Sequence, residues 1–369
     1  MPLYFPINVL IAPLDWGLGH ATRCIPIIKA LGDQGVTVLV AAGGPQKTLL
    51  QAEFPGLEFL EIPGYKVRYS GKKGGLVWGL IFQIPGILRN IRRENAWLKE
   101  RCRQRKIDAI ISDNRYGVYH KHKYSVFITH QLFIQSGFGN LANRILLKWN
   151  DRFIQRFSEC WVPDFPNPFS IAGILSHPPR LPSIPVKYIG ILSRFSRKEK
   201  KEFSNPLLIL ISGPEPQRTE FENKIFSELT RFPGRAVVVR GLPGMEEEKV
   251  ISNTNIEIHN HLASAPFNAM LNISETVICR SGYSTMMDLA RLRKKAILIP
   301  TPGQPEQEYL GRYLHEKKWA FTVSQKDFNL EQSMNVFHES EFGFPELPDA
   351  FLPEKLIREF INQFNMEKI

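Results

Sequence analysis

The chain has 369 residues, of which 43% are hydrophobic and 22% charged. This length is too great for one small core and suits two domains, and the composition excludes a disordered or fibrous protein. The net charge of +11 at pH 7 shows an excess of basic residues. Because the sequence contains no nucleic-acid recognition module, we expect no nucleic-acid partner.

The first half alternates short β-branched runs with helical stretches, which predicts a parallel sheet covered by helices. The expected strands are Ile7–Pro13, Val36–Ala42, Leu57–Ile62, Ile107–Ser112 and Ser125–Thr129. The expected helices are Ala21–Leu31, Gln46–Glu53, Gly86–Arg105 and Gly139–Phe157. A Pro-rich passage, residues 163–185, can be neither a continuous helix nor a central strand.

The second half repeats the alternation. Its expected strands are Pro206–Ser212, Ala236–Arg240, Asn255–His259, Thr276–Cys279 and Ala296–Pro300. Its expected helices are Pro216–Arg231, Ala265–Asn272, Tyr283–Leu292, Glu306–Lys317 and an amphipathic helix from Pro353 to Met366.

This organisation predicts an α/β fold with two Rossmann-like, doubly wound domains. We expect a first domain at residues 1–192, a charged linker at 193–205, a second domain at 206–345 and a C-terminal helix within 346–369. Two such domains predict a ligand cleft between the carboxyl ends of both sheets.

The cysteines and the N-terminal sequence indicate the cellular compartment of the protein. Cys24, Cys102, Cys160 and Cys279 are far apart without a Cys-x-x-Cys pair, which indicates neither a disulfide framework nor a zinc site. The start of the chain is apolar but lacks a basic region and fits a buried strand better than a signal peptide. No run reaches the roughly 18 to 20 apolar residues that span a bilayer. We therefore expect a cytoplasmic protein without a bound metal.

Most of the excess charge lies in one segment. From Lys66 to Lys106 the sequence holds twelve Lys and Arg against two Glu, and within it the stretch from Gly74 to Leu88 is apolar. Two interpretations remain open. The segment is either an apolar insertion beside a basic patch, which would make the protein peripheral on an anionic membrane surface, or a core helix followed by a solvated basic helix.

The first expected strand leads into a glycine loop, LDWGLGHATR, from Leu14 to Arg23. Gly17 and Gly19 allow a tight turn and a close approach of ligand to backbone at a helix N-terminus. The loop lacks the third glycine of a dinucleotide-binding motif, and the second strand ends without the acidic residue that holds a ribose. We therefore expect a ligand loop but no NAD or FAD cofactor.

His20 is the candidate general base. The positive end of a helix dipole favours the neutral imidazole that a base requires, and the switch-point rule places this loop on the ligand side of the sheet. A capping or packing histidine is the alternative. Asp15 and Asp113 follow or end expected strands and could orient His20 or form Asx turns.

In the second half, Ile278–Ala290 combines a strand, a Ser-Gly turn and a helix, and Ala296–Leu314 combines a strand ending in Pro300, a Gly/Pro loop and a helix. Ser281 and Gly282 could offer a hydroxyl and backbone N–H groups to a phosphate at the helix N-terminus. The carboxylate of Asp288 could accept hydrogen bonds from ribose hydroxyls. Residues suited to the hydroxyls of a bound sugar are Gln307 and Glu308.

Together these stretches resemble the GT-B glycosyltransferases of the MurG and monogalactosyldiacylglycerol-synthase type, family 28. Their C-terminal half has a Cys-Arg-Ser-Gly turn, an acidic residue on the next helix, and a Pro strand end followed by a Gln pair. The similarity in spacing covers residues 276–320 and extends to the His of the glycine loop. Residues 125–131 resemble the strand ending in His-Glu-Gln in these relatives, which implies that His130 and Gln131 lie on the acceptor side.

The resemblance implies that Asp288 binds the donor ribose, that Gln307 and Glu308 face the donor sugar, and that the diphosphate lies near the Ser-Gly turn. Residues implied near the diphosphate are Ser281, Gly282 and Ser284. Asp288 replaces a longer Glu and Glu308 replaces the second Gln, which leaves the donor sugar open. The loop from Ser212 to Arg218 replaces the family's Gly-Gly-Ser run, so Arg218 either contacts phosphate or is a surface residue.

The implied function is an inverting, metal-independent glycosyltransferase of the hexosyl type that moves a sugar from a UDP-sugar to an acceptor hydroxyl, with His20 as base. The acceptor is lipid- or polyprenyl-linked if the basic segment contacts a membrane. Two alternatives remain: a nucleotide-sugar hydrolase or 2-epimerase on the same fold, and a non-catalytic nucleotide-sugar or lipid-binding protein.

Overall fold

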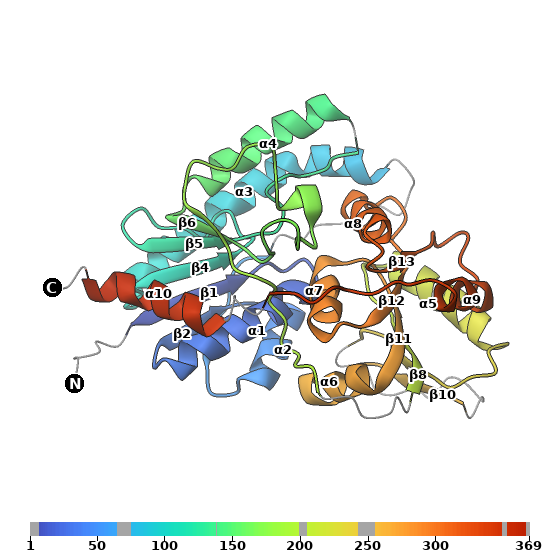
Figure 1. Cartoon of the computed structure of the whole chain (residues 1–369). Coiled ribbons are helices and arrows are strands. Elements are labelled where there is room, and N and C mark those ends of the chain that lie inside the picture. Colours follow the sequence, from blue (N-terminus) through green and yellow to red (C-terminus); the bar gives the residue numbers. More distant parts are fainter. Residues whose placement is uncertain are drawn as a thin grey trace. The chain divides into compact units, whose positions relative to one another are not determined.

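The computed structural model describes residues 7–64, 75–137, 139–198, 205–242, 255–348 and 353–366. The chain divides into two compact units (Figure 1). Unit 1 contains the chain before residue 65, Val77–Arg194 and the C-terminal segment Pro348–Ile369, and unit 2 contains Phe195–Leu347. The C-terminal helix, which the sequence predicted as an appended element, is thus counted with unit 1.

Unit 1 contains, over its described residues, a parallel sheet of seven strands in the order β3-β2-β1-β4-β5-β6-β7. The strands are β1 Asn8–Pro13, β2 Thr37–Ala41, β3 Glu58–Leu60, β4 Ala109–Asp113, β5 Tyr124–Ile128, β6 Glu159–Val162 and β7 Val186–Tyr188. The helices are α1 Leu18–Asp33, α2 Gly44–Glu53, α3 Gly75–Gln104, α4 Asn140–Ile154 and α10 Pro353–Met366. Figure 1 shows α3 and α4 on one face of this sheet and α1, α2 and α10 on the other.

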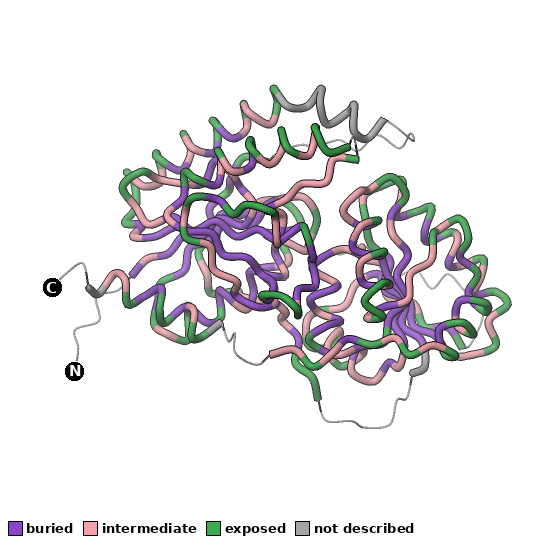
Figure 2. The backbone as a smooth tube through the Cα atoms, turned by 45° about the horizontal axis from the view of Figure 1, so that its top comes forward, coloured by how far each residue is buried: buried purple, intermediate pink, exposed green. Residues whose placement is uncertain are grey.

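Helices on both faces explain why the central strands are apolar along their whole length. The residues from Val9 to Ala12 in β1 are fully buried. On one face, Leu10 of β1 and Ile110 of β4 belong to a core cluster with Leu98 of α3. Figure 2 shows the same pattern, with buried strands inside the helices and exposed residues on the outer helix surfaces.

Unit 2 repeats the plan with six strands among its described residues, in the order β10-β9-β8-β11-β12-β13. The strands are β8 Asn205–Leu210, β9 Ala236–Val239, β10 Ile256–His259, β11 Ser274–Cys279, β12 Lys295–Leu298 and β13 Phe321–Thr322. The helices are α5 Gln217–Leu229, α6 Ser264–Ile273, α7 Tyr283–Leu292, α8 Pro305–Glu316 and α9 Leu330–His338. One core cluster joins Phe221 of α5, Phe337 of α9 and Ile278 of β11.

The predicted α/β class with two doubly wound sheets is confirmed. Four elements were not predicted from the sequence, because they are short or follow Pro-rich and charged stretches: β6, β7, β13 and α9. Strand β7 starts directly after Pro185 at the sheet edge, where a missing backbone N–H is tolerated. Among the described helices, none has an apolar stretch long enough to cross a bilayer.

Candidate active site

The strand order of unit 1 reverses between β1 and β4, and Pro13 at the end of β1 pairs with Asp113 at the end of β4. Ligands of open α/β sheets bind at such a switch point, beyond the carboxyl ends of the strands. Gly17 caps the N-terminus of α1 with a φ of 85°, a conformation that favours glycine. The cap turns the chain from β1 into α1, and the first turn of α1 carries Gly19 and His20.

Asp113 lies against the imidazole of His20. The Nδ1 atom of His20 is 3.1 Å from Oδ2 of Asp113, and the His20 side chain is 15% exposed whereas Asp113 is fully buried. Arg23, one helical turn after His20, donates from Nε to both carboxylate oxygens of Asp113, at 2.9 and 2.8 Å. Its Nη2 also pairs with Oδ1 of Asp113 and lies 2.9 Å from Nδ1 of His20.

These contacts determine the protonation states of Asp113 and His20. Burial alone would raise the pKa of Asp113, but the guanidinium of Arg23 and the neighbouring His20 outweigh it and lower the pKa to about 2. Burial and the charge of Arg23 lower the pKa of His20 from 6.5, against an opposing effect of Asp113. At neutral pH, Asp113 is therefore ionised and His20 is neutral.

Two tautomers of His20 fit the same contacts. Nδ1 lies within hydrogen-bond distance of a carboxylate, which accepts, and of a guanidinium, which donates, and one ring nitrogen cannot serve both at once. Nδ1 either carries the proton and donates it to Asp113 at 3.1 Å, or accepts from Nη2 of Arg23 at 2.9 Å. A general base requires the first arrangement, which leaves the lone pair on Nε2.

His130, which follows β5, joins the same cluster. It is 5% exposed, and its Nδ1 lies 3.2 Å from Nη1 of Arg23, so that Nδ1 accepts and Nε2 carries the hydrogen. Gln131 is half-buried, and its backbone accepts from Asn150 of α4 at 2.9 Å. Arg23 thus connects His20, Asp113 and His130.

Of the two candidate carboxylates, Asp113 contacts His20 and Asp15 is held elsewhere. Asp15 lies 3.4 Å from Nη2 of Arg115, whose buried guanidinium also pairs with Glu94 at 2.5 Å and donates to the carbonyl of Pro13 at 2.7 Å. Asp15 therefore belongs to the packing of the loop after β1. We assign the orientation of His20 to Asp113.

Sequence reasoning missed Arg23 and Asn114. Arg23 was visible only as the last residue of the glycine-loop motif, three positions after His20, where the helical repeat brings both onto one face. Asn114 follows Asp113 with a φ of 60°, and its buried Oδ1 has no hydrogen-bond partner among the described residues. Non-glycine residues in this conformation cluster at functional sites.

In unit 2, β8, β11 and β12 are neighbours, and each is followed by a helix whose N-terminus lies beyond the carboxyl edge of the sheet. Gly282 caps α7 in an extended conformation, with a φ of −75°, and a Cβ added to it would meet nothing within 4 Å. Ser284 and Asp288 are half-buried on α7. The space in front of the Gly282 backbone is thus open in unit 2.

Ser281 and Gln307 have different contacts from those expected. Ser281 is fully buried and donates its hydroxyl hydrogen to the carbonyl of Gln307 at 2.8 Å, so this hydrogen is not available to a phosphate. The Oε1 of Gln307 accepts from the backbone of Thr301 at 2.9 Å, and Oε1 of Glu308 accepts from that of Gly303 at 2.8 Å. Ser281 thus ties the α7 turn to α8, and the two α8 side chains shape the loop before it.

Arg218 is neutralised inside unit 2. It donates from Nε to Glu215 at 2.6 Å and from Nη1 to Glu222 at 3.2 Å, and Glu222 also pairs with Arg240 at 2.6 Å. A guanidinium shared by two carboxylates has little charge left for a phosphate, so the expected phosphate contact of Arg218 receives no support from these contacts.

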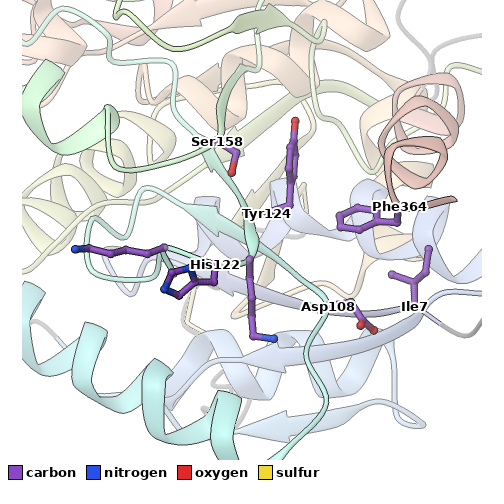
Figure 3. A pocket seen from close by; sticks show the side chains of 8 residues that line it. Ile7, Asp108, His122, Tyr124, Ser158 and Phe364 are labelled. Carbon is purple, nitrogen blue, oxygen red and sulfur yellow. The ribbon is translucent and has the colours of Figure 1, made fainter. Parts of the chain in front are cut away.

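A pocket lies at the opposite edge of the unit 1 sheet (Figure 3). Its lining includes Asp108 before β4, Tyr124 at the start of β5, Ser158 before β6 and Phe364 of α10. These residues lie at the amino ends of parallel strands, whereas ligands of such sheets bind beyond the carboxyl ends. No predicted site residue lines this pocket, and we assign it no role in the chemistry.

Known proteins with similar sequences are glycosyltransferases. Residues 245–340 match the model of the glycosyltransferase family 28 C-terminal domain. The chain is 25% identical over 327 residues to the UDP-N-acetylglucosamine–N-acetylmuramyl-(pentapeptide) pyrophosphoryl-undecaprenol N-acetylglucosamine transferase of Haemophilus ducreyi, covering 86% of this chain and 85% of that protein. It is 24% identical over 334 residues to an uncharacterized glycosyltransferase of Methanosarcina acetivorans, with 86% of each chain covered.

Solved glycosyltransferase structures share the fold. SnogD from Streptomyces nogalater aligns with a TM-score of 0.61 and 16% identity over 97% of this chain and 95% of its own. The spinosyn rhamnosyltransferase SpnG, complexed with thymidine diphosphate, aligns with a TM-score of 0.60 and 15% identity over 90% of this chain and 92% of its own. The chain is a glycosyltransferase with the GT-B fold, and the residues that match the glycosyltransferase family 28 C-terminal domain lie in unit 2.

Proposed function

We propose that the protein transfers a hexose from a UDP-sugar to an acceptor hydroxyl with inversion at the anomeric carbon. The observation that carries this proposal is the buried cluster at the switch point of unit 1. There Asp113 holds the imidazole of His20 through Nδ1 and leaves Nε2 to act as a base. Unit 1 thus supplies the base, and unit 2 supplies the donor site.

In the proposed reaction, Nε2 of His20 takes the proton of the acceptor hydroxyl while the acceptor oxygen attacks the anomeric carbon. The bond from that carbon to the diphosphate oxygen breaks, and its electron pair leaves with the diphosphate. The proton remains on His20 as an imidazolium, which the ionised Asp113 stabilises. One displacement on the face opposite the leaving group inverts the configuration.

The helix N-termini of unit 2 support donor binding without a metal ion. The N-terminus of an α-helix carries partial positive charge and unpaired N–H groups, which stabilise phosphate oxygens. Helices α5, α7 and α8 all start just after neighbouring strands of one sheet edge. We propose that the diphosphate lies against the Gly282 backbone, with Ser284 beside it, Asp288 on the ribose and Gln307 and Glu308 toward the sugar. The names of the relatives, which include a UDP-N-acetylglucosamine transferase and a thymidine diphosphate complex, favour a nucleoside diphosphate donor.

The acceptor is proposed to be lipid-linked, at an anionic membrane surface on the cytoplasmic side. The Haemophilus ducreyi relative is named for a pyrophosphoryl-undecaprenol acceptor. Residues 65–74 and the side chains of residues 75–84, which include most of the apolar segment noted in the sequence, lie outside the described part of the structure. The described part of α3 supports a basic surface, because Arg89, Arg92 and Arg93 are exposed.

Helix α4 adds an apolar stripe to the same unit. Leu141, Ile145 and Trp149, at i, i+4 and i+8, are 75%, 51% and 48% exposed. Basic side chains at the same spacing flank them: Arg144, Lys148 and Arg152. An exposed apolar stripe beside cations is the pattern of a helix that lies in the interface of an anionic bilayer.

A two-step experiment tests the proposed reaction. A thermal-shift screen over UDP- and dTDP-sugars identifies the donor by selective stabilisation. Proton NMR of the product, formed in the presence of EDTA, then gives the anomeric configuration. We expect stabilisation by a UDP-sugar and an inverted product. A retained configuration, or turnover that EDTA abolishes, would contradict the mechanism. Release of free sugar at the same rate with and without acceptor would favour the hydrolase.

A further inference from the structure

Arg280, the residue that follows β11, is buried, and among the described residues its side chain donates hydrogen bonds to backbone carbonyls alone. It is 1% exposed. Nη1 donates to the carbonyls of Ile299 and Pro300 at 3.1 and 3.2 Å, and Nη2 donates to that of Gln217 at 3.0 Å. Its guanidinium carbon lies 4.1 Å from the ring centroid of Phe221. Arg280 thus connects the end of β11, the end of β12 and the start of α5.

The charge of Arg280 has no carboxylate partner among the described residues. The nearest acidic influence on it is that of the exposed Glu220, and burial lowers the pKa of Arg280 to about 10, so that it stays cationic at neutral pH. Burying a cation without an anion is costly, and proteins normally pair such groups. Arg218 in the same unit shows the usual arrangement, with Glu215 and Glu222 against it. The contrast indicates that Arg280 is compensated by an anion from outside the chain.

Unpartnered polar atoms gather in the loops that Arg280 connects. Four buried side-chain atoms of this edge have no hydrogen-bond partner within the part of the chain that the structure describes: Nε of Arg280, Oε1 of Gln217, Oγ1 of Thr301 and Oε1 of Gln304. Gln217 begins α5, and Thr301 and Gln304 lie between β12 and α8. Because buried polar atoms are nearly always hydrogen-bonded, these four atoms mark a place where water or a polar ligand supplies the missing hydrogen bonds.

We propose that Arg280 is a positioning residue for the donor diphosphate, holding the N-termini of α5, α7 and α8 around the anion and supplying a buried positive charge behind the Gly282 backbone. The inference rests on the proposed function and specifies which residue makes this edge of unit 2 a diphosphate site. The side chain acts through its charge and its carbonyl contacts, because its own atoms are closed to solvent.

Binding of three probes separates this role from a purely structural one. The probes are UDP, inorganic pyrophosphate and uridine, titrated by ligand-observed NMR into the full chain. The variants are Arg280→Met, which removes the charge, and Arg280→Lys, which keeps the charge but cannot reach all three carbonyls. Arg291→Met, at an exposed position on helix α7 in the same unit, is the matched control.

We expect Arg280→Met to weaken binding of UDP and pyrophosphate by about tenfold or more, because it removes a buried positive charge near the anion, and to leave uridine within twofold. Arg280→Lys should keep most of the preference for UDP over uridine, and Arg291→Met should match the wild type. An equal loss for UDP and uridine, or a Lys variant that loses the UDP preference as fully as the Met variant, would overturn the proposal. If Arg280→Met does not fold, Arg280→Gln takes its place, because it also removes the charge but can still donate a hydrogen bond to a backbone carbonyl.

The outcome is independent of the proposed reaction. If the wild type binds pyrophosphate, Arg280→Met weakens that binding and Arg280→Lys largely keeps it, the role of Arg280 stands even if no UDP-sugar is turned over. If the wild type transfers sugar while both variants keep the full ratio of UDP to uridine affinity, the role of Arg280 fails and the reaction stands.

Discussion

Arg23 determines the state of the candidate base at the scale of single residues. It fixes Asp113 through two oxygens, keeps that carboxylate ionised and lies against both His20 and His130. The sequence predicted His20 and Asp113 from their places at the ends of strands, because the ends of parallel strands meet at one edge, and His130 from the family resemblance of residues 125–131. It could not predict Arg23, since a basic residue in a helix is normally solvated and only the fold shows that this one is buried.

The pH dependence of turnover tests the charge assignment. A neutral His20 is required, and its pKa lies below 6.5, so kcat/KM should be constant near neutral pH and fall tenfold per pH unit below a midpoint under 6.5. Asp113 raises the pKa of His20, so in Asp113→Asn the midpoint should move to lower pH and kcat should fall by about 10²–10⁴.

The measurement is a pH–rate profile of both proteins, with thermal unfolding as a check, because Asp113→Asn leaves Arg23 without its carboxylate. If the pH midpoint of kcat/KM does not move in a folded Asp113→Asn variant, Asp113 does not raise the pKa of His20, and the charge assignment is contradicted.

Gly282 offers a second test at the residue scale. Its φ of −75° suits any residue, and an added Cβ meets nothing in the protein, so Gly282→Ala should not lower the melting temperature. If the diphosphate approaches this backbone closely, the methyl group should weaken donor binding by about tenfold, an effect of roughly 1.4 kcal/mol. Calorimetric titration with UDP measures it.

Gly343→Ala is the matched control, because Gly343 also has open space around it and lies in the same unit. Unchanged UDP affinity in Gly282→Ala would remove this part of the proposed donor site.

At the scale of elements, the central strands and the helices beside them were predictable because their apolar runs are long and periodic. The start of α3 at Gly75 was not predictable, because the apolar stretch there suited a core helix and a membrane-inserted segment equally well. The amphipathic face of α4 was also missed. Its helical pattern was visible, but which face packs against the sheet depends on tertiary contacts, and the structure leaves Leu141, Ile145 and Trp149 outside.

The α4 stripe predicts membrane binding. The triple variant Leu141→Ser, Ile145→Ser and Trp149→Ser should reduce flotation with phosphatidylglycerol vesicles at low salt by at least about tenfold, because it removes three apolar side chains from the interface. Exposed substitutions of this kind change stability by about 0.5 kcal/mol or less each. Added salt should weaken binding of the wild type, since the flanking cations contribute through screened charge.

A matched control replaces three other exposed apolar residues by serine: Ile174, Leu181 and Val336, which are 37%, 44% and 40% exposed. This control should float like the wild type. Equal flotation of the α4 variant and the wild type would remove α4 from the proposed membrane surface.

For the whole molecule, the sequence predicted two doubly wound sheets because each half repeats the same alternation of strand and helix. It also predicted the switch-point site of unit 1, since the glycine loop directly follows the first strand. The contacts of Ser281 and Arg218 could not be predicted, because a hydroxyl or a guanidinium near a helix N-terminus fits a phosphate and an internal partner equally well. Their real partners, Gln307, Glu215 and Glu222, are set by packing.

The central claim is that unit 1 supplies the base and unit 2 holds the donor, and the most direct test is His20→Ala measured for both steps. With the UDP-sugar identified by thermal shift, we predict that turnover falls by about 10²–10⁴ while the dissociation constant of the donor stays within twofold of the wild-type value. Turnover retained in His20→Ala, or a loss of donor binding that accounts for the lost turnover, would contradict the account.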